Sequence, residues 1–91
     1  MAAYKDGLSP AIRVMVEKIN EVGVKEIRNY CDKHRHKMNF RRQLAIVRTI
    51  AQKGYTYAGY EHGISRQGAE LALKRLYNIA LEVEALKNAK K

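Results

Sequence analysis

The sequence has few of the residues that mark several common classes of protein: its 91 residues include one cysteine, one proline and no tryptophan. The lone Cys31 cannot form a disulfide within the chain, which fits a reducing compartment. The longest stretch without an acidic or basic side chain is seven residues, 54–60, which is too short to span a bilayer. The first residues lack the basic and apolar segments of a signal peptide, so we expect a cytoplasmic protein that does not bind a membrane.

Groups that carry catalysis or bind metals are also scarce. Asp6 and Asp32 are the only aspartates, no carboxylates are paired at metal-binding spacing, and no glycine-rich phosphate loop or nucleophile–base pattern is present. Cys31, His34 and His36 lie close together, but a structural zinc site takes its ligands from two separated pairs, and there is no second pair. We therefore expect no enzymatic activity, no metal and no cofactor, and we assign the histidines to a basic surface.

Positive charge is abundant and unevenly distributed. Eighteen Lys and Arg residues against nine Asp and Glu residues give a net charge of +9. Ten of the basic residues and only two of the acidic ones lie between positions 33 and 75, so this stretch carries +8 of that charge. Such a field attracts polyanions and indicates a nucleic-acid partner, although a merely soluble basic surface is the alternative.

Apolar residues at helical spacing predict an all-α fold, a small domain of about five helices that contains a helix-turn-helix. Ser9 and Pro10 favour a helix start, because serine caps free amides and proline is tolerated in the first turn. Gly23 ends this helix, and a second one follows and gives way to the polar run 33–37. Asn39 caps a third helix, which Gly54 ends. The inward faces comprise residues 12, 15, 16, 19 and 22, then 24, 27, 30 and 31, then 40, 44, 47, 50 and 51.

The segment 55–60 is ambiguous, since its alternating tyrosine and threonine also fit a short strand. Thr56 is a good helix cap, so we predict a short helix of about two turns. Ser65 caps the last helix, which runs from Arg66 to about Asn88. The single domain, residues 1–91, then comprises N-terminal helices at 1–38, a helix-turn-helix region at 39–77, and a C-terminal helix extension with a basic tail at 78–91.

The segment 56–76 meets the requirements of a helix-turn-helix, whose second helix lies in the major groove. Gly63 accepts the positive φ that the turn needs, and Gly59 is small enough for the two helices to cross closely. Ile64 supplies an apolar side chain beneath the turn. The second helix faces its partner with Ala69, Ala72, Leu73 and Leu76. An ordinary helical hairpin with a polar outer face is the alternative.

The outer face of this second helix carries side chains that suit DNA. Arg66 can make two hydrogen bonds to guanine, Gln67 two to adenine, and Glu70 can accept one from cytosine or fix a neighbouring cation. The predicted base-reading residues are Arg66, Gln67, Glu70, Leu71 and Lys74. Capped amides at the helix start suit a phosphate, and the basic residues of 33–42 can clamp the backbone. The predicted phosphate-binding residues are Ser65, Arg75, Arg41, Arg42, Lys37, Arg35 and Tyr57.

The motif comprises Ala58-Gly59, Gly63-Ile64-Ser65-Arg66-Gln67-Gly68-Ala69, Ala72 and Lys74-Arg75-Leu76. This pattern resembles the helix-turn-helix of TrfB/KorA-type plasmid repressors over residues 44–77, about a third of the chain. It is similar, more loosely, to PapB-like and phage regulators and to sigma-factor region 4. The resemblance implies a repressor in which the helix at 65–76 enters the major groove and a separate part makes the dimer. At Ala69 a larger aliphatic residue is usual in such motifs.

The last helix carries an apolar seam that continues beyond the motif. The seam comprises Ala69, Ala72, Leu76, Ile79, Val83 and Leu86, at alternating spacings of three and four. It packs either on the first helix of its own chain or against a second copy. Leu81 lies on the opposite side of the helix, and we expect this apolar side chain to pack against a partner as well. We predict a homodimer whose dimerisation residues are Ile79, Leu81, Val83 and Leu86.

Together these features predict a sequence-specific regulator of transcription that binds double-stranded DNA, a repressor on a palindromic operator. A protein-interaction factor that docks on RNA polymerase or another regulator is one alternative. A nonspecific architectural or RNA-binding protein is another. Strong salt dependence without sequence preference would distinguish the last of these.

Overall fold

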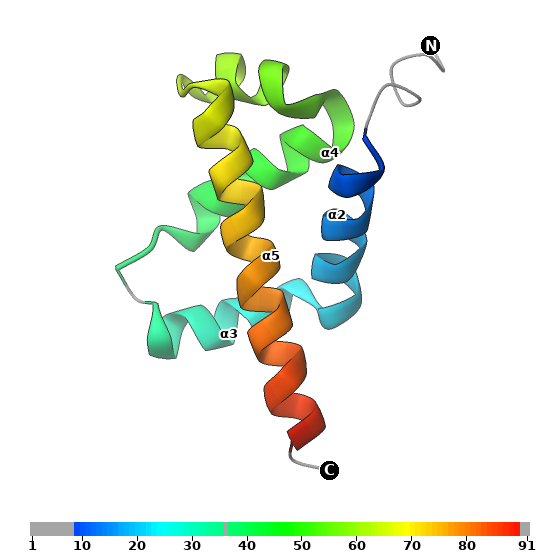
Figure 1. Cartoon of the computed structure of the whole chain (residues 1–91). Helices are drawn as coiled ribbons and strands as arrows, with labels where there is room; N and C mark the ends of the chain where they lie inside the picture. Colours follow the sequence, from blue (N-terminus) through cyan, green and yellow to red (C-terminus); the bar gives the residue numbers. More distant parts are fainter. Residues whose placement is uncertain (1–8, 36, 90–91) are drawn as a thin grey trace.

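The computed structural model describes residues 9–35 and 37–89 and is all-helical over these ranges (Figure 1). The helices are α2 (Pro10–Val22), α3 (Val24–His34), α4 (Phe40–His62) and α5 (Arg66–Ala89). The predicted all-α class and the length of the last helix are confirmed. Within the described ranges no helix is both long and apolar enough to cross a lipid bilayer.

The helix ends follow the predicted caps. The Ser9 hydroxyl accepts a hydrogen bond from the Ile12 amide at 3.2 Å, which satisfies a donor that the start of α2 leaves free. Gly23 ends α2 with a φ of 104°, a value that a residue with a side chain rarely adopts. The Asn39 side chain accepts from the Arg42 amide at 3.0 Å and starts α4. These local predictions are confirmed.

Helix α4 bends at Gly54, where φ is 86° and ψ is 176°, while the residues on both sides remain helical. Figure 1 shows the α4 ribbon changing direction along its length. The structure has four helices in the described residues where five were predicted, since the two helical segments that meet at the non-helical Gly54 form the single kinked helix α4. Residues 55–60 are helical, so the strand alternative is wrong.

Helix α5 runs through the middle of the molecule and packs against α2, α3 and α4 (Figure 1). Its inward face is buried from Ala69 to Val83 and forms the centre of the core. Partly buried side chains, including Met15, Phe40 and Leu44, pack against this core. The buried apolar residues are Ile12, Ile19, Val22, Ile27, Cys31, Ile46, Val47, Ile50, Ala58, Ala69, Ala72, Leu73, Leu76, Ile79, Ala80 and Val83.

From Ala69 to Val83 the apolar seam of α5 packs within its own chain. Ile79 is 2% exposed and Val83 is 5% exposed, so both belong to the core and are not free to face a second copy. This corrects their assignment as dimerisation residues. Leu81 and Leu86 remain exposed, at 37% and 49%.

Polar contacts tie the C-terminal half of α5 to α2 and α3. The Lys18 ammonium donates to Glu84 at 2.9 Å, and this hydrogen bond raises the pKa of Lys18. The Tyr30 hydroxyl donates to Glu82 at 2.9 Å, which likewise raises the pKa of Tyr30. The other oxygen of Glu82 lies 3.6 Å from the Arg35 guanidinium. These contacts join α2 and α3 to the C-terminal half of α5.

Candidate nucleic-acid interface

The connection between α4 and α5 is a tight turn built around Gly63. This residue is left-handed, with φ 67° and ψ 32°, as predicted from its position in the motif. The amide of Ile64 donates to the carbonyl of Gly59 at 2.8 Å, and that of Gly63 donates to Tyr60 at 3.4 Å. The turn therefore reverses the chain within a few residues.

Gly59 allows the turn to close against α4. A Cβ atom at this position would lie 2.8 Å from the carbonyl oxygen of Ile64, closer than real Cβ contacts come. Ile64 itself is half-buried and packs against the core. The Ser65 hydroxyl accepts from the Gly68 amide at 2.9 Å and starts α5. The direction of the first turns of α5 is thus fixed by close backbone packing.

One face of α5 is exposed along its first three turns. At about 100° per residue, Gln67, Leu71, Lys74 and Asn78 fall within about 60° of one another. All four are exposed, and Leu71 is 58% exposed despite its apolar side chain. We call this set the reading ridge. Asn78 was missed from the sequence, although it follows Lys74 at the same spacing of four residues at which Leu71 follows Gln67.

The other predicted base-reading residues lie on a flank of this ridge. Arg66 is about 140° around the helix from Leu71, and Glu70 is half-buried. Both line a groove between α5, the start of α2 and the bend of α4. The structure therefore brings Gln67, Leu71 and Lys74 together and turns Arg66 and Glu70 to the side.

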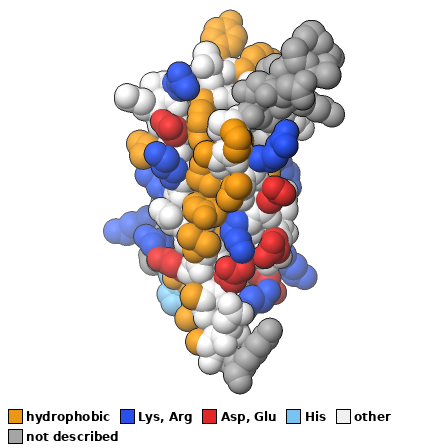
Figure 2. Space-filling view, turned by 45° about the vertical axis from the view of Figure 1, so that its right-hand side comes forward, with side chains coloured by type: hydrophobic (Ala, Val, Ile, Leu, Met, Phe, Trp, Pro, Cys, Tyr) orange, Lys and Arg blue, Asp and Glu red, His pale blue; other side chains and the backbone are white. Residues whose placement is uncertain are grey.

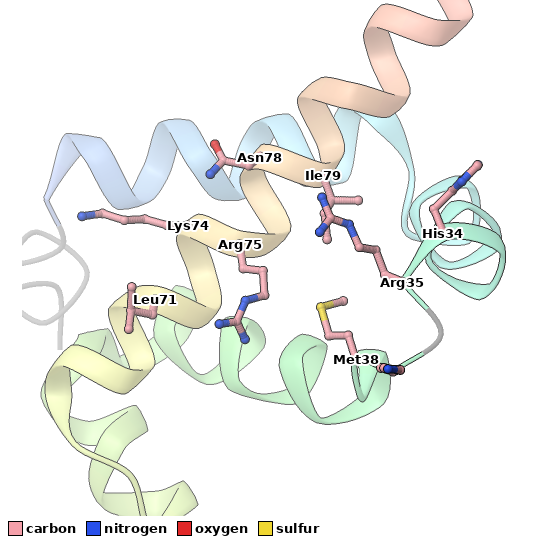
Figure 3. Close-up of a pocket in the computed structure, with 9 residues that line it drawn as sticks. His34, Arg35, Met38, Leu71, Lys74, Arg75, Asn78 and Ile79 are labelled. Carbon is pink, nitrogen blue, oxygen red and sulfur yellow. The ribbon is translucent and has the colours of Figure 1, made fainter.

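An open groove of about 770 Å³ lies on the opposite flank of the reading ridge (Figure 3). We call it the arm groove, and Figure 3 shows the Met38 side chain pointing into it between Arg75 and Arg35. Five of its lining side chains are basic types and none is acidic, so its field favours an anion. The lining residues are His34, Arg35, Lys37 and Met38 beside α3, and Leu71, Lys74, Arg75, Asn78 and Ile79 on α5.

The predicted phosphate-binding residues divide between this groove and other places. Arg35, Lys37 and Arg75 line the arm groove, although Arg35 also faces Glu82 as described above. Arg42 lies apart, where its guanidinium donates to the carbonyl of His62 at 3.5 Å. The predicted phosphate-binding residues of 33–42 therefore do not form one site. Arg35 and Lys37 line the arm groove, whereas Arg42 donates to the last residue of its own helix, α4.

Three further predicted phosphate ligands lie outside the arm groove. Arg41 is exposed near the start of α4 and does not line the groove. The Tyr57 hydroxyl accepts from the Lys53 ammonium at 3.1 Å, and that ammonium lies 4.2 Å from the centre of the ring. Ser65 is at the turn, where its oxygen already serves as the helix cap.

The residues weighed as metal ligands do not converge. Cys31 is 2% exposed, and burial raises the pKa of its thiol. His34 is exposed and its ring packs against Tyr30 at 4.5 Å between centres. His36 lies outside the described residues, and among the described residues no three His, Cys, Asp or Glu side chains are grouped to hold a metal ion.

Comparison of the chain with protein-family models, with curated proteins and with solved structures finds no match. The resemblance to TrfB/KorA-type repressors therefore stays a prediction.

Proposed function

We propose that this chain is a sequence-specific regulator of transcription that binds double-stranded DNA through a helix-turn-helix. The second part of α4 and the first half of α5 are the two helices of the motif. The observation that carries the proposal is an exposed polar ridge on α5, standing beside a groove whose charged side chains are all basic. This surface is complementary to a DNA duplex, whose major groove exposes base edges between two anionic backbones.

The reading ridge supplies the groups that base recognition needs. Gln67 can hydrogen-bond to the N6 and N7 atoms of adenine, and Lys74 can donate to O6 and N7 of guanine. The exposed Leu71 between them can contact a thymine methyl group, which gives an apolar side chain a use at this surface. Asn78 extends the ridge by one turn and suits adenine or the backbone.

The arm groove supplies the contacts with the phosphates of the DNA backbone. Arg75 comes from α5 itself, and Lys37 and Arg35 face it from across the groove. Phosphate contacts from two elements fix the register of the reading helix on the duplex, while base contacts specify the sequence. Each phosphate neutralised makes binding more sensitive to salt.

The oligomer that we propose is a homodimer acting as a repressor in the cytoplasm. Two reading heads would require half-sites about 34 Å apart, one turn of the duplex. With Ile79 and Val83 in the core, the exposed Leu81 and Leu86 are the predicted residues left for this contact. Sedimentation of the wild type and of Leu81→Asp tests it, and the variant is expected to be a folded monomer. Wild-type monomers at tens of micromolar would contradict the dimer.

Selection from a random pool of duplexes supplies a binding site, and titration then tests the proposal. The selected duplex and a scrambled one are titrated at several salt concentrations with wild type and Gln67→Ala. We expect wild type to prefer the selected duplex and Gln67→Ala to lose most of that preference. Failure to enrich any sequence would reject the proposal.

A protein-interaction factor remains the second candidate because of one observation. In the view of Figure 2, apolar side chains form a strip down the middle of the surface. Val14 of α2, 57% exposed, and Leu81 of α5 are among the exposed apolar residues. Docking on RNA polymerase or another regulator would show weak salt dependence and no sequence preference, so the same titrations distinguish the two functions.

A further inference from the structure

A second groove, of about 590 Å³, borders the reading ridge on the side away from the arm groove. We call it the α2-side groove. Its walls are the first turn of α2, the bend of α4 at Gly54 and the first turns of α5. Lys74 lines both grooves and so marks the ridge between them. The lining residues are Ser9, Ala11, Ile12, Met15, Lys53, Gly54, Tyr55, Thr56, Arg66, Glu70 and Lys74.

Three cationic side chains and one carboxylate line this groove. Lys53, Arg66 and Lys74 come from α4 and α5, and the half-buried Glu70 is the only acid among the lining residues. The Lys53 ammonium donates to the Tyr57 hydroxyl at 3.1 Å and lies 4.2 Å from the centre of the Tyr57 ring. With three cationic side chains and one acid among its lining residues, the groove favours an anion.

Arg66 belongs to this groove by its direction from α5. Burial, and after it the nearby Glu70, raises the pKa of the Tyr55 phenol, while Arg66 acts to lower it, so both charges lie near this ring. Tyr55 lies at the bend of α4, on the wall opposite α5. The Arg66 guanidinium in this groove lies beside the reading ridge. An arginine that reads bases has to project from the ridge itself.

The dimensions of DNA explain why a reading helix would need two such grooves. The major groove is about 12 Å wide, and a helix with its side chains is about 10–12 Å across. A helix in the major groove is therefore bordered by a sugar–phosphate backbone on each side. The arm groove can receive only one of them.

We propose that the α2-side groove binds the sugar–phosphate backbone of the second DNA strand, with Arg66 and Lys53 as phosphate ligands. This inference rests on the proposed function and changes the role of Arg66 from base reader to backbone contact. It also gives the first turn of α2 a place at the interface, next to the bend of α4. The duplex is then held from both sides of the ridge, and Gln67, Leu71 and Lys74 keep the reading of bases.

Phosphate ethylation of the selected duplex tests the assignment strand by strand. With wild type, ethylated phosphates are expected to block binding on both strands. Lys53→Gln and Arg66→Gln should remove that sensitivity on one strand, and Lys37→Gln and Arg75→Gln on the other. Arg28→Gln in α3 makes the same change of charge outside both grooves and should leave both patterns unchanged. Thermal unfolding of each variant shows whether it is folded.

Salt titrations and a second selection separate a backbone contact from a base contact at Arg66. We expect Arg66→Gln to lower the salt slope by about 1 and to select the same sequence as wild type. Arg66→Lys should restore the slope, because a phosphate contact needs the charge and not the fork of the guanidinium.

Two results would overturn the assignment while leaving sequence-specific binding intact. One is a change of preferred base at a single position with Arg66→Gln. The other is ethylation interference confined to the strand that the arm groove contacts. If the random pool yields no enriched sequence, the proposed function fails first, and the backbone assignment fails with it.

Discussion

The two halves of α5 lie in one straight helix but do different things. In residues 66–78 the exposed side is polar and cationic, with three Lys or Arg residues and one Glu, and it stands between two grooves. In residues 79–89 there are two Glu residues and one Lys, and Glu82 and Glu84 bond to α3 and α2. We propose that the first half faces a polyanion, whereas the second half packs against other helices of its own chain. A single periodic pattern in the sequence therefore covers two different roles.

The largest effect is expected from Val83→Asp in the second half. Val83 is 5% exposed, so the change places an unpaired carboxylate in the core and should cost more than about 4 kcal/mol of stability. Thermal unfolding measures it. Ala85→Asp, two residues later and exposed, is the control and should unfold near the wild-type temperature. A well-folded Val83→Asp variant would show that α5 does not pack on its own chain at this point.

In the first half, Gln67→Ala should weaken binding without weakening the fold. The loss of two hydrogen bonds to a base should cost about 1–3 kcal/mol on the selected duplex and far less on a scrambled one. Fluorescence titration gives the affinities, and unfolding without DNA should be unchanged because Gln67 is exposed. Equal losses on both duplexes would remove Gln67 from base reading.

The turn before α5 offers a matched pair of substitutions. Gly59→Ala places a Cβ 2.8 Å from a carbonyl oxygen and should cost about 1–3 kcal/mol by overpacking. At Gly63 a Cβ meets nothing within 4 Å, so Gly63→Ala suffers only from the positive φ, at about 1 kcal/mol. Denaturant unfolding without DNA compares them. A larger loss at Gly63 than at Gly59 would contradict the close approach of the turn to α4.

The smallest effect is expected from Glu82→Gln in the second half. The change weakens the hydrogen bond from Tyr30 and the ion pair with Arg35, both largely exposed, so stability should fall by under about 1 kcal/mol. Removing this charge beside the arm groove should tighten DNA binding slightly. Unchanged affinity at low salt would show that Arg35 makes no contact with the backbone.

The same contact gives a dependence on alkaline pH. The pKa of Tyr30 is raised from its ordinary value of 10.0, chiefly by the hydrogen bond that its neutral hydroxyl donates to Glu82. This stabilisation is fully present below pH 10.0 and is lost as the pH rises through the raised pKa. The difference in unfolding free energy between wild type and Tyr30→Phe should therefore shrink as the pH rises from 8 to 11. A constant difference would show that the hydrogen bond does not form.

Features set by a few neighbouring residues could be predicted from the sequence. Ser9, Asn39 and Ser65 cap helices because a short polar side chain can reach the amides that follow it. Gly63 could be placed in the turn because few other residues accept its backbone angles. The class of fold followed from the apolar spacing, which needs no knowledge of packing.

Features set by packing could not be predicted in the same way. The apolar pattern of Ile79 and Val83 is the same whether they meet α2 or a second chain. Arg66 and Gln67 are neighbours in sequence, but about 100° of rotation puts one in a groove and the other on the ridge. The arm groove needs α3 and α5 to come together, so neither its shape nor the place of Asn78 in it is visible in the sequence.

The central claim is that the first half of α5 and its two grooves meet DNA while the second half does not. The most direct test records the backbone amide NMR signals of the chain as the selected duplex is added. We expect the largest shifts at residues 65–78, with smaller ones beside the arm groove and at the start of α2, and little change at residues 79–89. Shifts centred on Leu81 and Val14, with residues 65–78 unmoved, would contradict the claim.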